Sequence, residues 1–242
     1  MELPKIFFLQ INSLMNKKKI LCIIPGRGGS KSIKNKNLLK LGKYTLIEHA
    51  ILFAKKSKKF CNITLSSDSK KILKIGLKNK INTIIRSKKN STDKALVSSA
   101  IHEVLNIYKK KGIFFDIVVL LEPTCPFRKI NHLNNCLKIL IKNNIDSIAT
   151  FSNALLNPNR SWKIKKNKPI TYFKKTIPWK NKQSFSKAYQ LNGSIYAFST
   201  KNFKPSTNDL LFGNSQAYIC DENEILIDID NKNDYLIAKL LF

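Results

Sequence analysis

Short apolar runs alternate with longer amphipathic segments along most of the chain. The apolar runs have strand length and predict strands over residues 20–24, 62–66, 82–86, 116–121 and 146–150. Between them, apolar residues recur at helical spacing and predict helices over about 45–59, 69–79, 94–111 and 129–143. Strands that alternate with helices through short connections form a parallel sheet covered on both faces, so the pattern predicts an α/β fold.

The alternation stops near residue 151. Residues 151–190 are rich in Asn, Lys, aromatic residues and Pro, and they are too many for an ordinary loop. They predict an extended arm or a small β excursion. The core resumes with a strand over 192–198. Two further strands are predicted at 218–220 and 225–227, and a final helix at 231–241.

The first 19 residues do not fit this pattern. Their apolar piece, residues 6–9, is too short to span a membrane, and no small-residue cleavage site follows it in the usual place. Met15, followed by Asn16 and three lysines, would itself be a sensible start. We therefore expect residues 1–19 to form a flexible extension and 20–242 to form a single domain with an arm at about 151–190.

The first predicted strand runs directly into a glycine-rich basic loop, Pro25-Gly26-Arg27-Gly28-Gly29-Ser30-Lys31. Glycines let a backbone approach oxyanions closely, and Arg and Lys neutralise their charge, so the loop is typical of a phosphate site. It matches neither the P-loop nor the dinucleotide fingerprint. A generic basic loop after a strand is the alternative.

The net charge of +29 would suit nucleic acid or a membrane surface. The lysines, however, lie along nearly the whole chain among many Asn and Ile, which indicates a compositional bias. No nucleic-acid motif and no stacking pattern of aromatic residues accompany them. A basic nucleic-acid-binding protein is therefore the alternative from another class, and we expect no nucleic-acid or membrane partner.

Arginine and cysteine are informative against this background. Among 44 Lys and Arg residues only four are arginine, Arg27, Arg86, Arg128 and Arg160, which suggests sites that need a planar, bidentate fork. Chance survival of any one of them is the alternative. The five cysteines are scattered and form no CxxC pair. They indicate free thiols in a reducing cytoplasm.

Carboxylates are scarce, so two groups of them stand out. Asp228 and Asp230 alternate at period two, which on a strand places both on one face, and paired carboxylates suit Mg²⁺. A solvated strand end is the alternative. Glu122 ends a buried strand and begins a proline-restricted turn that leads to Arg128. Here the alternative is a rigid turn with Arg128 paired to a carboxylate and Cys125 as a small filler.

The phosphate loop, Arg86 and Glu122 all follow the carboxyl ends of predicted strands. Ligands of open parallel sheets bind beyond those ends. We therefore expect the three to meet in one crevice.

Six motifs occur in order from residue 20 to the C-terminus: Ile23–Lys31, Lys36–Leu38, Ser67-Asp68, Leu120–Arg128, Asn192–Tyr196 and Asp228–Asp230. Together they resemble the motifs of the N-acylneuraminate cytidylyltransferases, the CMP-sialic acid synthetases, and of their legionaminic and pseudaminic acid relatives. The resemblance implies a Rossmann-like nucleotide-diphospho-sugar transferase fold, with an arm that exchanges contacts in a homodimer.

It also implies a Mg²⁺-dependent reaction in which the anomeric hydroxyl of a nine-carbon acidic sugar attacks the α-phosphorus of CTP and pyrophosphate leaves. The implied catalytic residues are Arg27, Lys36, Asp228 and Asp230, the two aspartates as metal ligands. The implied nucleotide-binding residues are Gly28, Gly29, Ser30, Lys31, Asn37, Arg86 and Asp93. The implied sugar-binding residues are Glu122, Arg160, Lys182 and Tyr196, with Arg160 and Lys182 reaching in from a partner subunit.

The chain departs from the family pattern at four places. Gly26 stands where Ala is usual, Ala95-Leu96-Val97 where serines are expected, and Lys182 where the arm has Arg. Glu122 replaces the Gln of sialic acid enzymes and favours sugars with extra hydrogen-bond donors, such as further N-acyl groups. The remaining alternatives are the eight-carbon sugar Kdo as substrate and an inactive paralogue of the same fold.

Overall fold

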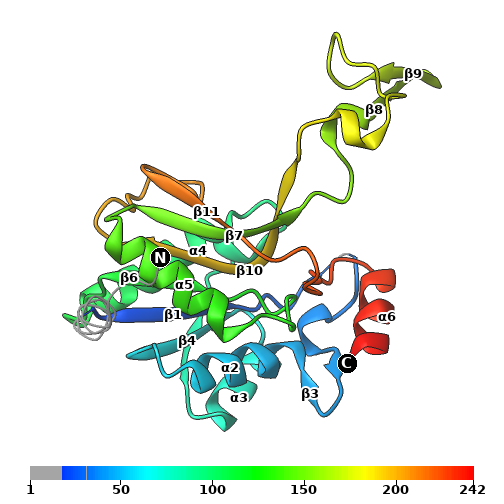
Figure 1. The fold of residues 1–242 in the computed structure, drawn as a ribbon. Helices are drawn as coiled ribbons and strands as arrows, with labels where there is room; N and C mark the ends of the chain where they lie inside the picture. Colours follow the sequence, from blue (N-terminus) through cyan, green and yellow to red (C-terminus); the bar gives the residue numbers. More distant parts are fainter. Residues whose placement is uncertain (1–17, 31) are drawn as a thin grey trace.

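The structure, a computed structural model, describes residues 18–30 and 32–242 (Figure 1). Of the extension expected over 1–19, all but the last two residues lie outside the described part. Across the described residues, no helix has both the length and the apolar character needed to cross a membrane.

A seven-stranded sheet forms the centre of the molecule. β1 (Ile20–Pro25) lies between β4 (Asn62–Ser67) and β6 (Ile117–Leu120), and both pairings are parallel. The complete order is β11-β7-β10-β6-β1-β4-β5, with β5 at Asn82–Ile85, β7 at Ser147–Asn153, β10 at Tyr189–Ser199 and β11 at Ser215–Ile219. Only β10 among the described strands of this sheet runs antiparallel to its neighbours. The predicted α/β fold with a mostly parallel sheet is confirmed.

Helices cover both faces of this sheet, as the continuous apolar run of β1 requires. Cys22 and Ile24 pack among α2, α3 and α5, whereas Leu21 and Ile23 pack against α4 on the other face. The bounds of these helices are Leu46–Ser57 for α2, Lys70–Lys78 for α3, Val97–Lys110 for α4 and Ile130–Lys142 for α5. Each overlaps the helix predicted for it.

The arm lies between β7 and β10. It contains two short 3₁₀ turns, η3 (Pro158–Arg160) and η4 (Lys182–Ser184), and a two-stranded hairpin of β8 (Trp162–Lys165) and β9 (Lys168–Thr171). Figure 1 shows this hairpin standing away from the body of the molecule. The β excursion expected at 151–190 is present.

The prediction for the C-terminal region was partly wrong. β11 begins and ends earlier than the expected 218–220, and residues 225–227 form no strand. The alternating apolar residues there pack instead into a small cluster, in which fully buried Ile229 contacts residues near β2 (Lys40–Leu41), β3 (Tyr44–Thr45) and α6 (Lys232–Leu241). Asp228 and Asp230 therefore lie on an irregular segment, not on a strand.

Candidate active site

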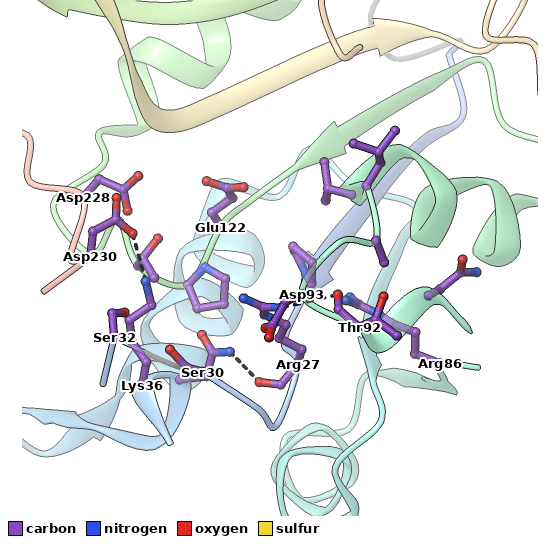
Figure 2. Close-up of a pocket in the computed structure, with 18 residues that line it drawn as sticks. Arg27, Ser30, Ser32, Lys36, Arg86, Thr92, Asp93, Glu122, Asp228 and Asp230 are labelled. Carbon is purple, nitrogen blue, oxygen red and sulfur yellow. Dashed lines mark hydrogen bonds and ion pairs between the residues drawn. The ribbon is translucent and has the colours of Figure 1, made fainter. Parts of the chain in front are cut away.

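The carboxyl ends of β1, β5 and β6 open onto a pocket of about 510 Å³ (Figure 2). The sequence-predicted residues that line it are Arg27, Ser30, Lys36, Asn37, Arg86, Asp93, Glu122, Asp228 and Asp230. The phosphate loop, Arg86 and Glu122 thus meet in one crevice, as expected. Figure 2 places Asp228 and Asp230 at one end, Arg86 toward the other and Arg27 between them.

Arg27 is held inside the pocket by a carboxylate from across it. Its Nη1 lies 2.8 Å from Oδ1 of Asp93, and the same nitrogen donates to the carbonyl of Thr92 at 3.4 Å. The side-chain amide of Asn37 donates to the Arg27 carbonyl at 2.9 Å. Asn37 therefore fixes the loop backbone, and Arg27 presents a cation whose present partner an anionic ligand could replace.

Gly28 and Gly29 shape the loop without lining the pocket. The Gly28 amide donates to Oδ1 of Asp68 at 2.7 Å, and a Cβ there would lie 2.8 Å from Cβ of Ser69. Glycine is required at 28 because the loop passes so close to the start of α3. A Cβ at Gly29 would meet nothing within 4 Å. Lys31 lies outside the described residues.

The acidic end of the pocket is built around Ile229. Its amide donates to the Thr124 carbonyl at 2.9 Å and its side chain is fully buried, which sends Asp228 and Asp230 to the same side. Lys36 Nζ lies 2.9 Å from Oδ1 of Asp230. Burial of Ile229 therefore places both aspartates on the same side of the segment. The sequence pattern had predicted this arrangement from a strand.

This end fits a hard divalent cation. Oδ1 of Asp228 is buried and has no hydrogen-bond partner among the described residues. Burial, with the neighbouring charge of Asp230, raises the pKa of Asp228 even though Thr124 hydrogen-bonds its carboxylate. An unpaired carboxylate oxygen beside a second carboxylate is the donor set that Mg²⁺ prefers.

Glu122 lies at the same end of the pocket, and its carboxyl group has a raised pKa. Burial, and after it the charge of Asp228, raises its pKa to about 7, although Arg128 opposes the shift. Tyr196 does not line the pocket; it sits on β10 opposite Leu120. Burial, together with the nearby Glu122, raises the pKa of its hydroxyl.

The turn after β6 is rigid because Arg128 is buried inside it. Its guanidinium donates to the backbone carbonyls of Glu122 and Ser194 and does not pair with a carboxylate among the described residues. Cys125 is buried, its thiol donates to the Asn192 carbonyl at 3.4 Å, and burial raises its pKa. Cys125 is a packing residue, as the sequence indicated.

Arg86 forms part of the far wall. It is buried and bonds β4, with Nε 3.2 Å from Oγ of Ser66 and Nη2 3.0 Å from the Ser66 carbonyl. Burial lowers its pKa. Beside it the stretch Ala95-Leu96-Val97 lines the pocket, so this wall is apolar where the resemblance had led us to expect serines.

Arg160 and Lys182 are not brought to this pocket. They lie in η3 and η4 of the arm, and Lys182 lines a separate hollow with Asn153, Asn157 and Phe185. Within one chain the structure does not unite these two predicted sugar ligands with Glu122.

Sequence reasoning included Gly193 in the motif Asn192–Tyr196 but gave it no role in the site. Its φ is +68°, and a Cβ there would lie 2.6 Å from Sγ of Cys125 and 2.9 Å from Oδ2 of Asp228. An Asn-Gly pair inside a strand pattern was the available signal. It also overlooked the pocket residues Ser32, Asn90 and Thr92, whose residue types are too common in this chain to stand out.

Comparison with known proteins gives consistent results. Residues 21–211 match a family model described as cytidylyltransferase. The chain is 33% identical to the CMP-N,N'-diacetyllegionaminic acid synthase of Legionella pneumophila, over 92% of this chain and 96% of that protein. It is 29% identical to a pseudaminic acid cytidylyltransferase of Campylobacter jejuni, over 93% and 96% of the two chains.

Solved structures agree on the fold. A CMP:2-keto-3-deoxy-manno-octonic acid synthetase complexed with CTP matches with a TM-score of 0.64 at 12% identity, over 92% of this chain and 98% of that one. These matches give the nucleic-acid-binding hypothesis no support. The family model covers most of the chain, the relatives match over nearly their full length, and the pocket lies beyond the parallel strands. We conclude that this chain belongs to the cytidylyltransferase family.

Proposed function

We propose that this enzyme transfers CMP from CTP to the anomeric hydroxyl of a nine-carbon acidic sugar and releases pyrophosphate. The observation that carries the proposal is the single pocket that gathers Arg27 and Lys36 with Asp228 and Asp230. The names of the relatives supply the class of sugar: diacetyllegionaminic, pseudaminic and N-acylneuraminic acids.

In the proposed reaction the anomeric oxygen forms a bond to the α-phosphorus, and the bond from that phosphorus to the bridging oxygen of pyrophosphate breaks. The hydroxyl loses its proton and pyrophosphate leaves with the electron pair. Arg27 and Lys36 would neutralise the triphosphate, and Ser30 lines the same pocket. Lys31, which lies outside the described residues, is proposed as a further phosphate-binding cation on the basis of the sequence alone. Phosphoryl transfer depends mostly on such positioning and charge neutralisation.

Asn37, Arg86 and Asp93 would lie along the nucleotide. Arg27 would exchange its ion pair with Asp93 for phosphate oxygens when CTP binds. Gly28 and Gly29 hold the loop close to α3 and leave its outer side open.

Asp228 and Asp230 would hold Mg²⁺, because one offers a buried unpaired oxygen and the other an exposed carboxylate. When bound, the ion would neutralise phosphate charge and favour ionisation of the attacking hydroxyl. Lys36, which now pairs with Asp230 and lines the same pocket as Arg27, could contact both the metal ligands and the phosphates.

Glu122 would face the sugar from the pocket wall, and Tyr196, outside that wall on β10, would contact a part of the sugar that extends beyond it. The Glu122 carboxyl would accept a hydrogen bond from an N–H of the sugar, which favours nonulosonates with additional N-acyl groups over plain sialic acid. Its position beside Asp228 supports contact with the sugar near the reacting hydroxyl.

The direct test is a sugar panel incubated with CTP and Mg²⁺ and monitored for pyrophosphate. The panel contains sialic, legionaminic, pseudaminic and diacetyllegionaminic acids and the eight-carbon Kdo, each with UTP as the matched nucleotide control. We expect CTP-dependent release with at least one bacterial nonulosonate. Release with Kdo alone would contradict the sugar class, and no release with any sugar would favour an inactive paralogue.

We also propose that the arm joins two copies of the chain. Several large apolar side chains on it are exposed, including Trp179, which is 82% exposed. The others are Trp162, Ile164, Ile170, Tyr172, Phe173 and Ile177. A second copy would cover this surface and bring Arg160 and Lys182 to its partner's pocket.

The five cysteines are all unpaired, which supports a reducing cytoplasm as the place of action.

Trp179→Glu is expected to convert a dimer into a monomer in sedimentation velocity, because it buries a charge in the apolar contact. Leu240→Glu, at an exposed apolar side chain on α6, is the matched control and should leave the dimer intact.

Mixing inactive Arg160→Ala and Asp230→Asn subunits should restore activity, since each hybrid dimer has one complete site if the arm acts across the interface. No recovery would show that the arm serves its own subunit.

A further inference from the structure

The segment that carries Asp228 and Asp230 has little regular structure to hold it. Residues 220–231 run between β11 and α6 without a helix or strand. At its start the Cys220 amide donates to the Phe151 carbonyl at 2.8 Å, and near its end Ile229 is fixed to Thr124. Between these anchors, Glu222 accepts a hydrogen bond from the exposed Asn153 side chain at 2.9 Å, and Glu224 contacts two residues at the start of α5.

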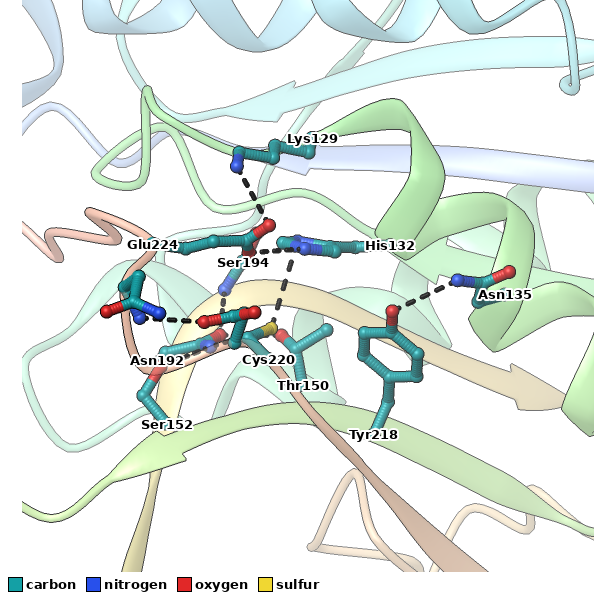
Figure 3. A network of polar contacts seen from close by, with 12 residues as sticks. Lys129, His132, Asn135, Thr150, Ser152, Asn192, Ser194, Tyr218, Cys220 and Glu224 are labelled. Carbon is teal, nitrogen blue, oxygen red and sulfur yellow. Dashed lines mark hydrogen bonds and ion pairs between the residues drawn. The ribbon is translucent and has the colours of Figure 1, made fainter.

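Glu224 is bound at both carboxylate oxygens by residues at the start of α5. Oε2 lies 2.6 Å from Nε2 of His132, and Oε1 lies 2.8 Å from Nζ of Lys129 (Figure 3). The His132 side chain is only 4% exposed and that of Glu224 only 18%. This is a partly desolvated contact, and such contacts are worth more than an exposed ion pair.

The same histidine reaches back to the start of the segment. Nδ1 of His132 lies 3.8 Å from Sγ of Cys220, and Cys220 in turn accepts a hydrogen bond from the Asn192 side chain at 3.5 Å. With the proton on Nε2, the ring turns its N–H edge toward Glu224, in a close contact without hydrogen-bond alignment, while Nδ1 can accept from the thiol. Burial lowers the pKa of His132, and the positive charge of Lys129 lowers it further. The negative charge of Glu224 raises it, but burial is the larger effect, which agrees with a neutral ring.

Asn192 extends the network to the other side of Asp228. Its Oδ1 accepts from Thr150 Oγ1 at 2.6 Å and from the Ser194 amide, and its Nδ2 donates to Ser152 at 2.9 Å. The next residue, Gly193, packs against the carboxylate of Asp228. The network therefore supports Asp228 both through its own segment and through the strand behind it.

His, Cys and Glu are also residue types that bind Zn²⁺. Here, however, the thiol faces Nδ1 while the carboxylate faces Nε2, and the lone pairs of those two nitrogens diverge. Lys129 already pairs with the carboxylate. One ligand atom from each of the three side chains lies within 4.8 Å of the others, but their direct contacts with one another and with Lys129 favour a clamp over a shared ion.

We propose that His132, Cys220 and Glu224 form a clamp that positions Asp228 and Asp230 for the divalent cation. None of the three lines the pocket, so they are positioning residues. The consequence for the cation rests on the proposed function, whereas the ordering of residues 220–231 does not. Loss of the clamp should weaken cation binding by about tenfold, as is common for residues that support metal ligands.

The test compares His132→Phe and Glu224→Leu with His102→Phe. His102 is a matched control because it also packs against an aromatic ring, Phe203, but on the α4 side of the sheet. Mn²⁺ binding to the CTP complex is followed by electron paramagnetic resonance, and ordering of residues 220–231 by amide hydrogen exchange. Glu224→Gln keeps the length and the polar end of the side chain beside His132 and Lys129 and should restore part of the loss.

We expect the two clamp variants to bind Mn²⁺ about tenfold more weakly and to exchange faster across 220–231, with CTP affinity little changed at saturating Mn²⁺. Wild-type exchange and Mn²⁺ affinity in both variants would overturn the proposal. One equivalent of zinc in the purified protein would overturn it too, since the cluster would then be a metal site. If even the unaltered enzyme binds no Mn²⁺, the proposed function fails, while the exchange data still decide whether the clamp orders the segment.

Discussion

Asp230→Asn is expected to lower kcat/KM by about 10²–10³-fold while leaving the fold intact. The side chain is 73% exposed and forms an ion pair with Lys36, so little folding energy depends on its charge. Removing the charge would leave Asp228 as the single carboxylate of the proposed Mg²⁺ site. Initial rates of pyrophosphate release across a Mg²⁺ titration measure the effect, and thermal unfolding checks the fold.

Glu222→Gln is the matched control for this experiment. Glu222 is another exposed carboxylate of the same segment, but it bonds Asn153 at 2.9 Å and lies outside the pocket. Its variant should turn over at the wild-type rate. Near-normal turnover of Asp230→Asn would refute the metal role of the aspartate pair.

Glu122→Gln is expected to stabilise the cation-free protein at pH 8 and to change its stability little at pH 5. The folded-state pKa of about 7 lies above the ordinary value of 4.5, so the folded state holds this proton more tightly than the unfolded chain does. The resulting stability is complete below pH 4.5 and is lost as the pH rises through 7. At pH 8 the buried charge costs up to about 3 kcal/mol, which glutamine avoids.

Tm measured from pH 5 to pH 8, in chelator and then in saturating Mg²⁺, tests this expectation. The gain at pH 8 should shrink when Mg²⁺ is added, because a cation at Asp228 and Asp230 offsets the same repulsion. Glu222→Gln, at an exposed carboxylate, should show no such pH dependence. An equal Tm change at both pH values would mean that Glu122 is already ionised in the folded protein at pH 5.

The sequence predicted the parts of the site that short-range physics determines. The apolar run of β1 had to be a buried strand, and glycines with Arg27 after it had to face the carboxyl edge of the sheet. Arg86 and Glu122 followed from the same reasoning, because they come just after strand ends.

What the sequence could not predict depends on contacts between distant segments. Period-two alternation at Asp228 and Asp230 resembles a strand, but no neighbouring strand pairs with it, and burial of Ile229 decides its path. The bond from Gly28 to Asp68 joins residues 40 positions apart. The positions of Arg160 and Lys182 depend on the arm, whose proposed partner is a second chain.

The strand pairing at the base of the arm has an evolutionary consequence. Asn153 of β7 lies opposite Tyr189 of β10, and the two strands are antiparallel neighbours, so the whole arm is one enlarged hairpin connection. Because its two ends already meet, further length adds only slowly to the entropy of loop closure. Insertions, deletions and substitutions can accumulate there without changing the strand order or the pairing of the sheet. The roles proposed for the arm, in acceptor choice and subunit contact, could therefore diverge among descendants of this chain while the pocket at the strand ends is inherited unchanged.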